Sequence, residues 1–231
     1  MISKEDFFKI AGVNQHSQFQ QFLKDIIFDR PRREKFYHDI LDIDYQCVND
    51  DLFRTYFEKY AAERKSNQQD FTPQSIAKLL AALSNQNSKK TGWSCYDPAA
   101  GTGTLIITKW NKDRLKVSPF NYYPYNYFYL AEEKSDVAIP YLINNLAIRG
   151  MNAVVIHGDT IERKANQVYF IQNAKNDFLH FSSINVMPHS EDIMKEFDIR
   201  EWLEEPIDYI EDSLEDVKWL TIKKGVKHDI K

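Results

Sequence analysis

One stretch decides the predicted fold: Asp97-Pro98-Ala99-Ala100-Gly101-Thr102-Gly103-Thr104. The apolar run 93–96 precedes it, and residues 105–110 follow it with apolar side chains at helical spacing. These segments predict a strand, a glycine turn and the start of a helix. Two glycines separated by one small residue let the backbone turn sharply and approach a ligand, while an acidic residue at the strand end can accept hydrogen bonds from a cationic group. The pattern predicts a site for a nucleoside-type cofactor.

A bare Gly-x-Gly pair is usually explained by turn geometry, but the eight-residue string is more specific than that. It resembles motif I of the amino-group DNA methyltransferases, in the form found in the modification subunits of type I restriction systems. In that family the loop holds S-adenosylmethionine. An aspartate suits this cofactor because its ammonium and sulfonium groups are cationic, whereas a pyrophosphate would be repelled. The resemblance implies cofactor contacts from Asp97, Pro98, Ala99, Gly101, Thr102 and Gly103.

A second motif lies ahead of the glycine loop. Phe71-Thr72-Pro73-Gln74 predicts the start of a helix that runs to about Leu83, with Thr72 as N-cap and Pro73 at the first helical position. The segment also resembles the cofactor-flanking segment of the family, motif X. Two motifs at this spacing are stronger evidence than either alone, and the resemblance implies that Phe71, Thr72 and Pro73 border the cofactor.

Acidic residues also end the next two predicted strands. A strand over 125–131 leads into Glu132 and Glu133, where a carboxylate can accept hydrogen bonds from both ribose hydroxyls. The family pattern favours Glu133 for this role, with Glu132 second. The presence of Glu132 is explained equally well by the preference for an acidic residue near a helix N-terminus. A third strand over 153–157 stops at Gly158-Asp159. Its resemblance to motif III implies that Asp159 accepts a hydrogen bond from the amine of the cofactor adenine.

The catalytic motif of the family is expected after a fourth strand. It consists of a polar residue, two prolines and an aromatic, which hold the target amino group and stack on the flipped base. Asn185 stands at the polar position, but Val186 and Met187 replace the two prolines. Pro188 or His189 stands where the aromatic is expected, and a histidine can stack on a base. The catalytic candidates are Asn185 and His189.

The resemblance covers about residues 70–190 and implies an α/β fold with a Rossmann-like, S-adenosylmethionine-dependent methyltransferase sheet. A complete sheet needs three more strands than the chain has room for, so a truncated sheet is expected. Residues 1–68 are predicted to be a helical N-terminal extension, with three helices between Ser17 and Lys65. Residues 69–190 form the predicted cofactor-binding domain, and residues 191–231 are read as an acidic helical segment.

Composition limits the class of protein. At 231 residues and 43% hydrophobic, the chain can bury a sizeable core. The net charge is −4, but residues 191–216 hold twelve acids against two bases, so the remainder is mildly basic and compatible with phosphate contacts. No stretch approaches the roughly 20 apolar residues of a membrane span, and the N-terminus lacks a signal-peptide core, so a cytoplasmic location is expected. Two cysteines are too few for a disulfide framework or a zinc site, and no metal is predicted.

The first functional hypothesis is an S-adenosylmethionine-dependent DNA adenine-N6 methyltransferase, or a subunit of one, in a restriction-modification or mobile-element system. DNA is its expected partner, together with a second protein subunit that completes the fold or supplies specificity. The alternative is a catalytically inactive, methyltransferase-like binding protein that acts through DNA or protein contacts. A nicotinamide-dependent oxidoreductase is disfavoured, because Ile106 occupies the site where a third glycine is expected.

Overall fold

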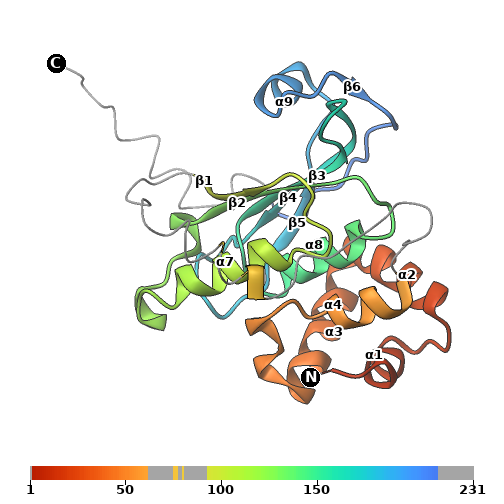
Figure 1. Ribbon diagram of the computed structural model, residues 1–231, viewed down its shortest axis with the longest axis vertical. Coiled ribbons are helices and arrows are strands. Elements are labelled where there is room, and N and C mark those ends of the chain that lie inside the picture. Colours follow the sequence, from red (N-terminus) through yellow and green to blue (C-terminus); the bar gives the residue numbers. More distant parts are fainter. Residues whose placement is uncertain (1, 62–74, 78–79, 81–92, 213–231) are drawn as a thin grey trace.

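The computed structural model describes residues 2–61, 75–77, 80 and 93–212 of the chain. Its helices and strands form three layers: a mixed sheet, the helices α7 and α8 beneath it, and a group of N-terminal helices beneath those (Figure 1). Among the described residues, no helix has the length and apolar character needed to cross a membrane.

The N-terminal layer confirms the three expected helices as α2 (His16–Asp25), α3 (Arg30–Ile43) and α4 (Arg54–Tyr56), which continues as a π-helical turn over Phe57–Ala61. A helix that was not predicted, α1 (Lys4–Ala11), precedes them. Its signal was present in the sequence, because Ser3 and Asp6 form a reciprocal capping box. Short 3-10 turns at Ile26–Phe28 and Tyr45–Asn49 link these helices.

The remaining elements build and flank the sheet. The strands are β1 (Trp93–Asp97), β2 (Phe128–Glu133), β3 (Ala153–Asp159), β4 (Lys164–Gln172), β5 (Ser183–Val186) and β6 (Glu201–Trp202). The helices are α7 (Thr104–Arg114), α8 (Ile139–Ala147) and α9 (Glu191–Glu196), with 3-10 turns at Pro119–Asn121 and Pro124–Asn126.

Strand order in the sheet is β1-β2-β3-β4-β5, with β6 paired to β4. Strands β1, β2 and β3 are parallel, whereas β4 runs antiparallel to both β3 and β5. The first βαβαβ portion, with α7 and α8 as its crossovers, is the Rossmann-like unit expected from the glycine loop. The prediction of an α/β fold with a Rossmann-like sheet is confirmed, and the described residues contribute six strands to that sheet.

Helix α8 joins the layers. All nine of its residues are buried, and it contacts β3 and β4 on one side and α2 on the other. Its Asn144 is satisfied by the N-terminal layer: the Tyr37 hydroxyl donates to its Oδ1 at 2.8 Å, and its Nδ2 donates to the Leu23 carbonyl at 3.1 Å. One hydrophobic core therefore includes both the predicted N-terminal extension and the sheet. The boundary at residue 68 stays a prediction.

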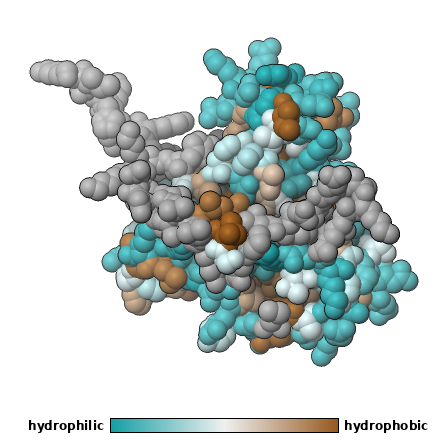
Figure 2. Space-filling model, viewed as in Figure 1, coloured by the Kyte–Doolittle hydropathy of each residue, from teal (hydrophilic) through white to brown (hydrophobic). Residues whose placement is uncertain are grey.

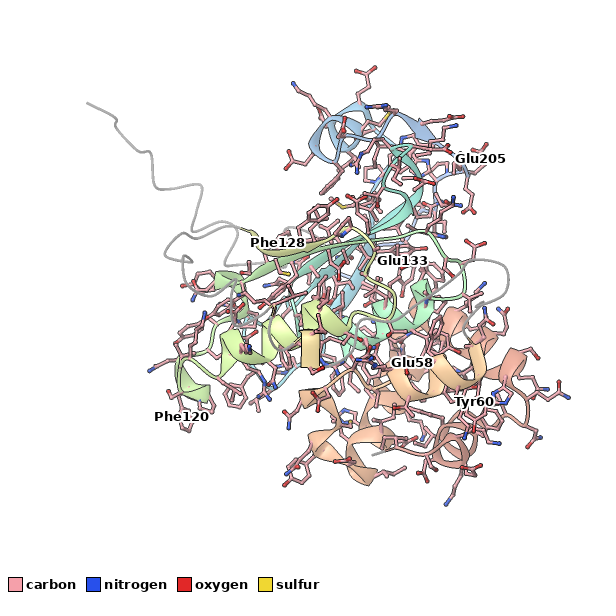
Figure 3. All side chains as sticks on the ribbon, viewed as in Figure 1. Glu58, Tyr60, Phe120, Phe128, Glu133 and Glu205 are labelled. Atoms are coloured by element: carbon pink, nitrogen blue, oxygen red, sulfur yellow. The ribbon has the colours of Figure 1, made fainter. Side chains whose placement is uncertain are left out.

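The aromatic segment before β2 is partly packed. Tyr122 is buried, accepts a hydrogen bond from Trp110 Nε1 at 2.9 Å and stacks on Tyr127. Phe120 remains 83% exposed. Figure 2 shows apolar residues at the lower left of a mostly hydrophilic face, where Figure 3 labels Phe120.

In the C-terminal third one strand was missed and one expectation is wrong. Strand β4 was not predicted, although Val168-Tyr169-Phe170-Ile171 is a β-branched and aromatic run typical of a strand. In the segment expected to be an acidic helix, the described part contains only the six-residue α9 and the two-residue β6, and residues 203–210 have no regular structure. Two acidic side chains of this segment, Glu211 and Asp212, make specific contacts with the N-terminal layer.

One such contact ties Glu211 to the N-terminal layer. Arg33 of α3 and Glu211 form an ion pair at 2.5 Å, with side chains 1% and 4% exposed. The Glu211 carboxylate also accepts from the Ile184 backbone N–H at 3.0 Å, so the segment follows the outer edge of β5. Arg30 pairs with the neighbouring Asp212 at 3.4 Å.

Replacing Glu211 tests this buried pair. We expect E211Q to lower the free energy of unfolding by about 3 kcal/mol, because it leaves the buried Arg33 charge without its partner. The matched control is D39N in the exposed Lys35–Asp39 pair, where the loss should stay below about 1 kcal/mol. Chemical denaturation measures both, and equal losses in the two variants would contradict the role given to Arg33.

Candidate cofactor-binding site

The site is built around the turn from β1 into α7. Gly101 and Gly103 have φ angles of +56° and +97°, a left-handed region that side chains with a Cβ rarely adopt. A Cβ on Gly103 would lie 2.9 Å from Leu142 Cδ1 of α8, whereas one on Gly101 would meet nothing within 4 Å. A side chain at Gly103 would therefore force the Leu142 side chain to shift, in addition to the strain of the positive φ angle, whereas the space beside Gly101 is open.

Glu133 reaches this turn from β2. Its Oε2 accepts from the Gly101 N–H at 2.7 Å and its Oε1 from the Ser135 N–H at 2.8 Å. Glu132 lies on the opposite face of the strand, where it pairs with Arg163 at 3.0 Å and accepts from the Tyr96 hydroxyl at 2.9 Å. Of the two candidates, the structure brings Glu133 to the glycine loop (Figure 3).

Asp159 ends β3 beside the same loop. The Thr160 hydroxyl donates to the Pro98 carbonyl at 2.8 Å, which joins the end of β3 to the loop. Lys134 donates to Asp159 Oδ2 at 2.8 Å, while the Ile161 and Glu162 N–H groups donate to Oδ1. The hydrogen bond from Lys134, with those from the backbone, lowers the pKa of Asp159 to about 2, so its carboxylate is ionised near neutral pH.

Asp97 supplies a buried carboxylate at the end of β1. It is 6% exposed, and its Oδ1 accepts from the Ala99 N–H at 3.2 Å. Burial, together with the charge of Glu133, raises the pKa of Asp97 above its ordinary value of 3.8. Among the described residues no cation pairs with it, so a cationic ligand would relieve the cost of its ionised form.

The remaining predicted cofactor residues divide into two groups. Ala99 and Thr102 lie in the turn with the glycines, and Thr102 is 1% exposed. Phe71, Thr72 and Pro73 lie outside the described residues. Lys134 and Thr160 were missed by sequence reasoning. Their signal is position alone, since each directly follows a predicted site residue at the end of a parallel strand.

The structure does not bring Asn185 to the glycine loop. It lies on β5, which is separated from β1 by three strands, or about 19 Å at the usual strand spacing. Its Oδ1 accepts from the N–H groups of Glu211 and Asp212 at 2.8 and 3.2 Å. Asn185 is a predicted catalytic candidate, but β4 pairs antiparallel with β3 and carries β5 to the side of the sheet away from β1.

In the described part of the chain, His189 makes its side-chain contacts with β4 and β6 and not with the glycine loop. It stacks on Trp202 with ring centroids 3.7 Å apart, and its Nε2 lies 3.1 Å from Gln167 Oε1. Burial lowers its pKa below the ordinary value. The ring that was expected to stack on a base therefore already packs on another side chain. Among the described residues no cluster suited to a metal ion is found.

Comparison with known proteins assigns this arrangement to a class. The family model described as N-6 DNA Methylase matches residues 48–197, and the chain belongs to this family. No curated protein matches the sequence. Among solved structures, the chain is similar to a class I S-adenosylmethionine-dependent methyltransferase from Listeria monocytogenes, at 17% identity and a TM-score of 0.46. The match covers 68% of this chain and 53% of that one, so the chain spans about half of that protein's length.

S-adenosylmethionine is the cofactor that membership in this family implies. The residues present fit such a group. Asp97 is a buried carboxylate without a described cation partner, Glu133 offers a second carboxylate, and Gly101 leaves open backbone between them. Two carboxylates and an exposed loop suit a ligand that carries positive charge and hydroxyl groups.

The raised pKa of Asp97 gives a test of its role. In the cofactor-free protein the pKa of Asp97 is higher in the folded state than the ordinary 3.8 of the unfolded chain. The free energy of unfolding of wild type should therefore fall relative to that of D97N as the pH rises above 3.8. At pH 7 we expect D97N to be at least as stable as wild type but to bind S-adenosylmethionine at least about tenfold more weakly, as for a lost charge-assisted contact. Thermal unfolding and calorimetric titration measure the two effects, and a destabilised D97N with unchanged affinity would contradict this role.

Asn185 provides the opposite case. Because its amide oxygen holds the backbone of Glu211 and Asp212, we expect N185A to lower the free energy of unfolding by about 1–3 kcal/mol. Its affinity for S-adenosylmethionine should stay within about twofold of wild type, since β5 lies at the far side of the sheet. A selective loss of cofactor affinity in a stable N185A protein would show that Asn185 belongs to the site after all.

Proposed function

We propose that this chain is the cofactor-binding subunit of an S-adenosylmethionine-dependent DNA adenine-N6 methyltransferase of a restriction-modification or mobile-element system. Its target would be adenine in DNA, and a DNA substrate calls for a cytoplasmic location. When bound, S-adenosylmethionine supplies an electrophilic methyl group. The observation that carries the proposal is the convergence of Asp97, Glu133 and Asp159 at the carboxyl ends of three parallel strands, around the glycine loop.

Each carboxylate has a proposed task. Asp97 is buried and suits the cationic end of the cofactor, because an ionised partner offsets the cost of burying its charge. Glu133 already accepts a backbone N–H of the loop and suits the ribose hydroxyls. Asp159 is ionised and partly exposed, with Lys134 beside it, and suits the exocyclic amine of the cofactor adenine.

The position of β1 supports a second subunit. In doubly wound sheets, ligands bind where the strand order reverses, which requires a strand on each side of β1. In the described part of this chain β1 pairs with β2 only. A strand from another polypeptide, added in parallel on the free side, would end next to Asp97 and could present the polar group that holds the target adenine. We therefore propose that catalysis requires a partner subunit that completes the sheet.

The rival function, an inactive binding protein, is favoured by one observation. Asn185 is committed to the backbone of residues 211–212 and is not directed to the glycine loop. An inactive protein of this kind would act through DNA or protein contacts and not through methyl transfer.

Two measurements separate these functions. S-adenosylmethionine is titrated into the purified chain, with D97N as control, and transfer of radiolabelled methyl groups to adenine in unmethylated genomic DNA is then measured. We expect saturable binding by the chain alone, no transfer by the chain alone, and transfer by a complex purified from its source through a tag on this chain.

The outcomes are distinct. Methyl transfer that appears with the tagged complex and disappears in its D97N version supports the proposed subunit. Transfer by the chain alone would contradict the need for a partner. Binding of the cofactor without transfer in either preparation would favour the inactive protein, and absence of binding would overturn the cofactor assignment.

A further inference from the structure

Asp51 lies just ahead of α4, and its carboxylate joins two distant segments. Its Oδ1 accepts from the backbone N–H groups of Phe53 and Arg54, both at 3.1 Å, as an N-cap does. Its Oδ2 accepts from the hydroxyls of Thr102 and Thr104, at 2.5 and 2.6 Å. These threonines flank Gly103 in the turn that forms the candidate site.

A third segment meets the same carboxylate. Asn145 of α8 donates through Nδ2 to Asp51 Oδ1 at 2.7 Å and to the Thr102 carbonyl at 2.8 Å. Arg149 in turn donates to Asn145 Oδ1 at 2.9 Å, which fixes the orientation of the amide. The side chain and the carbonyl of Thr102 are therefore both held, one by the N-terminal layer and one by α8.

Helix capping alone does not account for this arrangement. A serine or threonine hydroxyl would cap α4 as well as an aspartate does. What a carboxylate adds is a second acceptor oxygen, and here that oxygen is used entirely for the two threonine hydroxyls of the loop. Hydrogen bonds to a charged acceptor contribute more than those between neutral groups.

We propose that Asp51 is a positioning residue, which acts through Thr102 and Thr104 to hold the glycine loop in its cofactor-binding shape. The loop needs such support because Gly101 and Gly103 give its backbone more freedom than other residues would. A loop that already has its binding conformation in the free protein loses less conformational entropy when the cofactor binds, so the affinity is higher. The inference rests on the proposed binding of S-adenosylmethionine and adds that the N-terminal layer sets its strength.

The variant D51S tests this role, because serine keeps a capping oxygen for α4 but cannot reach both threonines. We expect it to weaken S-adenosylmethionine binding by about tenfold, the size of one lost charge-assisted contact. The matched control is D29S, which alters the N-cap of α3, where Asp29 accepts only from the Arg32 N–H in its capping contact. Its affinity should stay within about twofold of wild type.

A double-mutant cycle with T104V separates positioning from general loss of stability. If the carboxylate acts through the threonine hydroxyl, the double variant should bind little more weakly than D51S alone, because both changes remove the same link. Amide hydrogen exchange in the peptide covering 101–107 should become faster in D51S and in T104V but not in D29S. That exchange is measured without cofactor and reports the shape of the loop itself.

Each result decides the matter. Affinity of D51S within about twofold of wild type, or effects of D51S and T104V that simply multiply, would overturn the inference. If D51S does not fold, T104V alone must weaken binding and speed exchange, and an unchanged T104V would overturn it. If wild type itself does not bind S-adenosylmethionine, the proposed function fails together with this inference, and the wild-type titration shows this before any variant is made.

Discussion

The turn at Gly101 and Gly103 is the constraint on which the rest of the structure depends. Its two left-handed residues let the chain leave β1 and enter α7 within a few residues, so that α7 lies beneath the sheet. Gly103 also lies close to Leu142 of α8, whose side chain would have to shift to admit a Cβ at this position. In this turn the Gly101 N–H donates to Glu133, and the Thr102 hydroxyl donates to Asp51. The turn is therefore the place where the sheet, α8, the N-terminal layer and the Glu133 carboxylate are in contact.

The order of the strands then determines what the chain can do alone. Strands β1, β2 and β3 bring three acidic side chains to one end of the sheet, but β4 turns back against β3 and places β5 at the far side. The residue that resembles the catalytic position in sequence is thereby used to hold the C-terminal segment. The ion pair between Arg33 and Glu211 fastens that segment to the N-terminal helices. Topology thus keeps the candidate cofactor site apart from Asn185, and a partner is proposed on the side of β1 that no described strand occupies.

Much of the cofactor side of the fold could be predicted from residues alone. The glycine turn, the strands on either side of it and the acidic strand ends are local patterns, and parallel strands necessarily bring their carboxyl ends to one edge. The choice of Glu133 over Glu132 agrees with the alternation of side chains across a strand, but only the fold shows that Glu132 pairs with Arg163. Strand β4 escaped prediction although its apolar run was visible, and the acidic segment was misread because charge alone resembles a solvated helix.

The sequence by itself determined the nature of the turn, its cofactor class and the helical character of the N-terminal residues, because these depend on glycine conformation, charge and apolar spacing over a few residues. Only the tertiary structure decided that Asn185 lies far from Asp97, since a one-dimensional pattern does not state whether the next strand adds to one side of the sheet or the other. The same holds for Asp51, whose position in the sequence indicates only that it lies just ahead of α4. Its hydrogen bonds to Thr102 and Thr104 link segments about fifty residues apart and exist only when the helical layer packs against the loop.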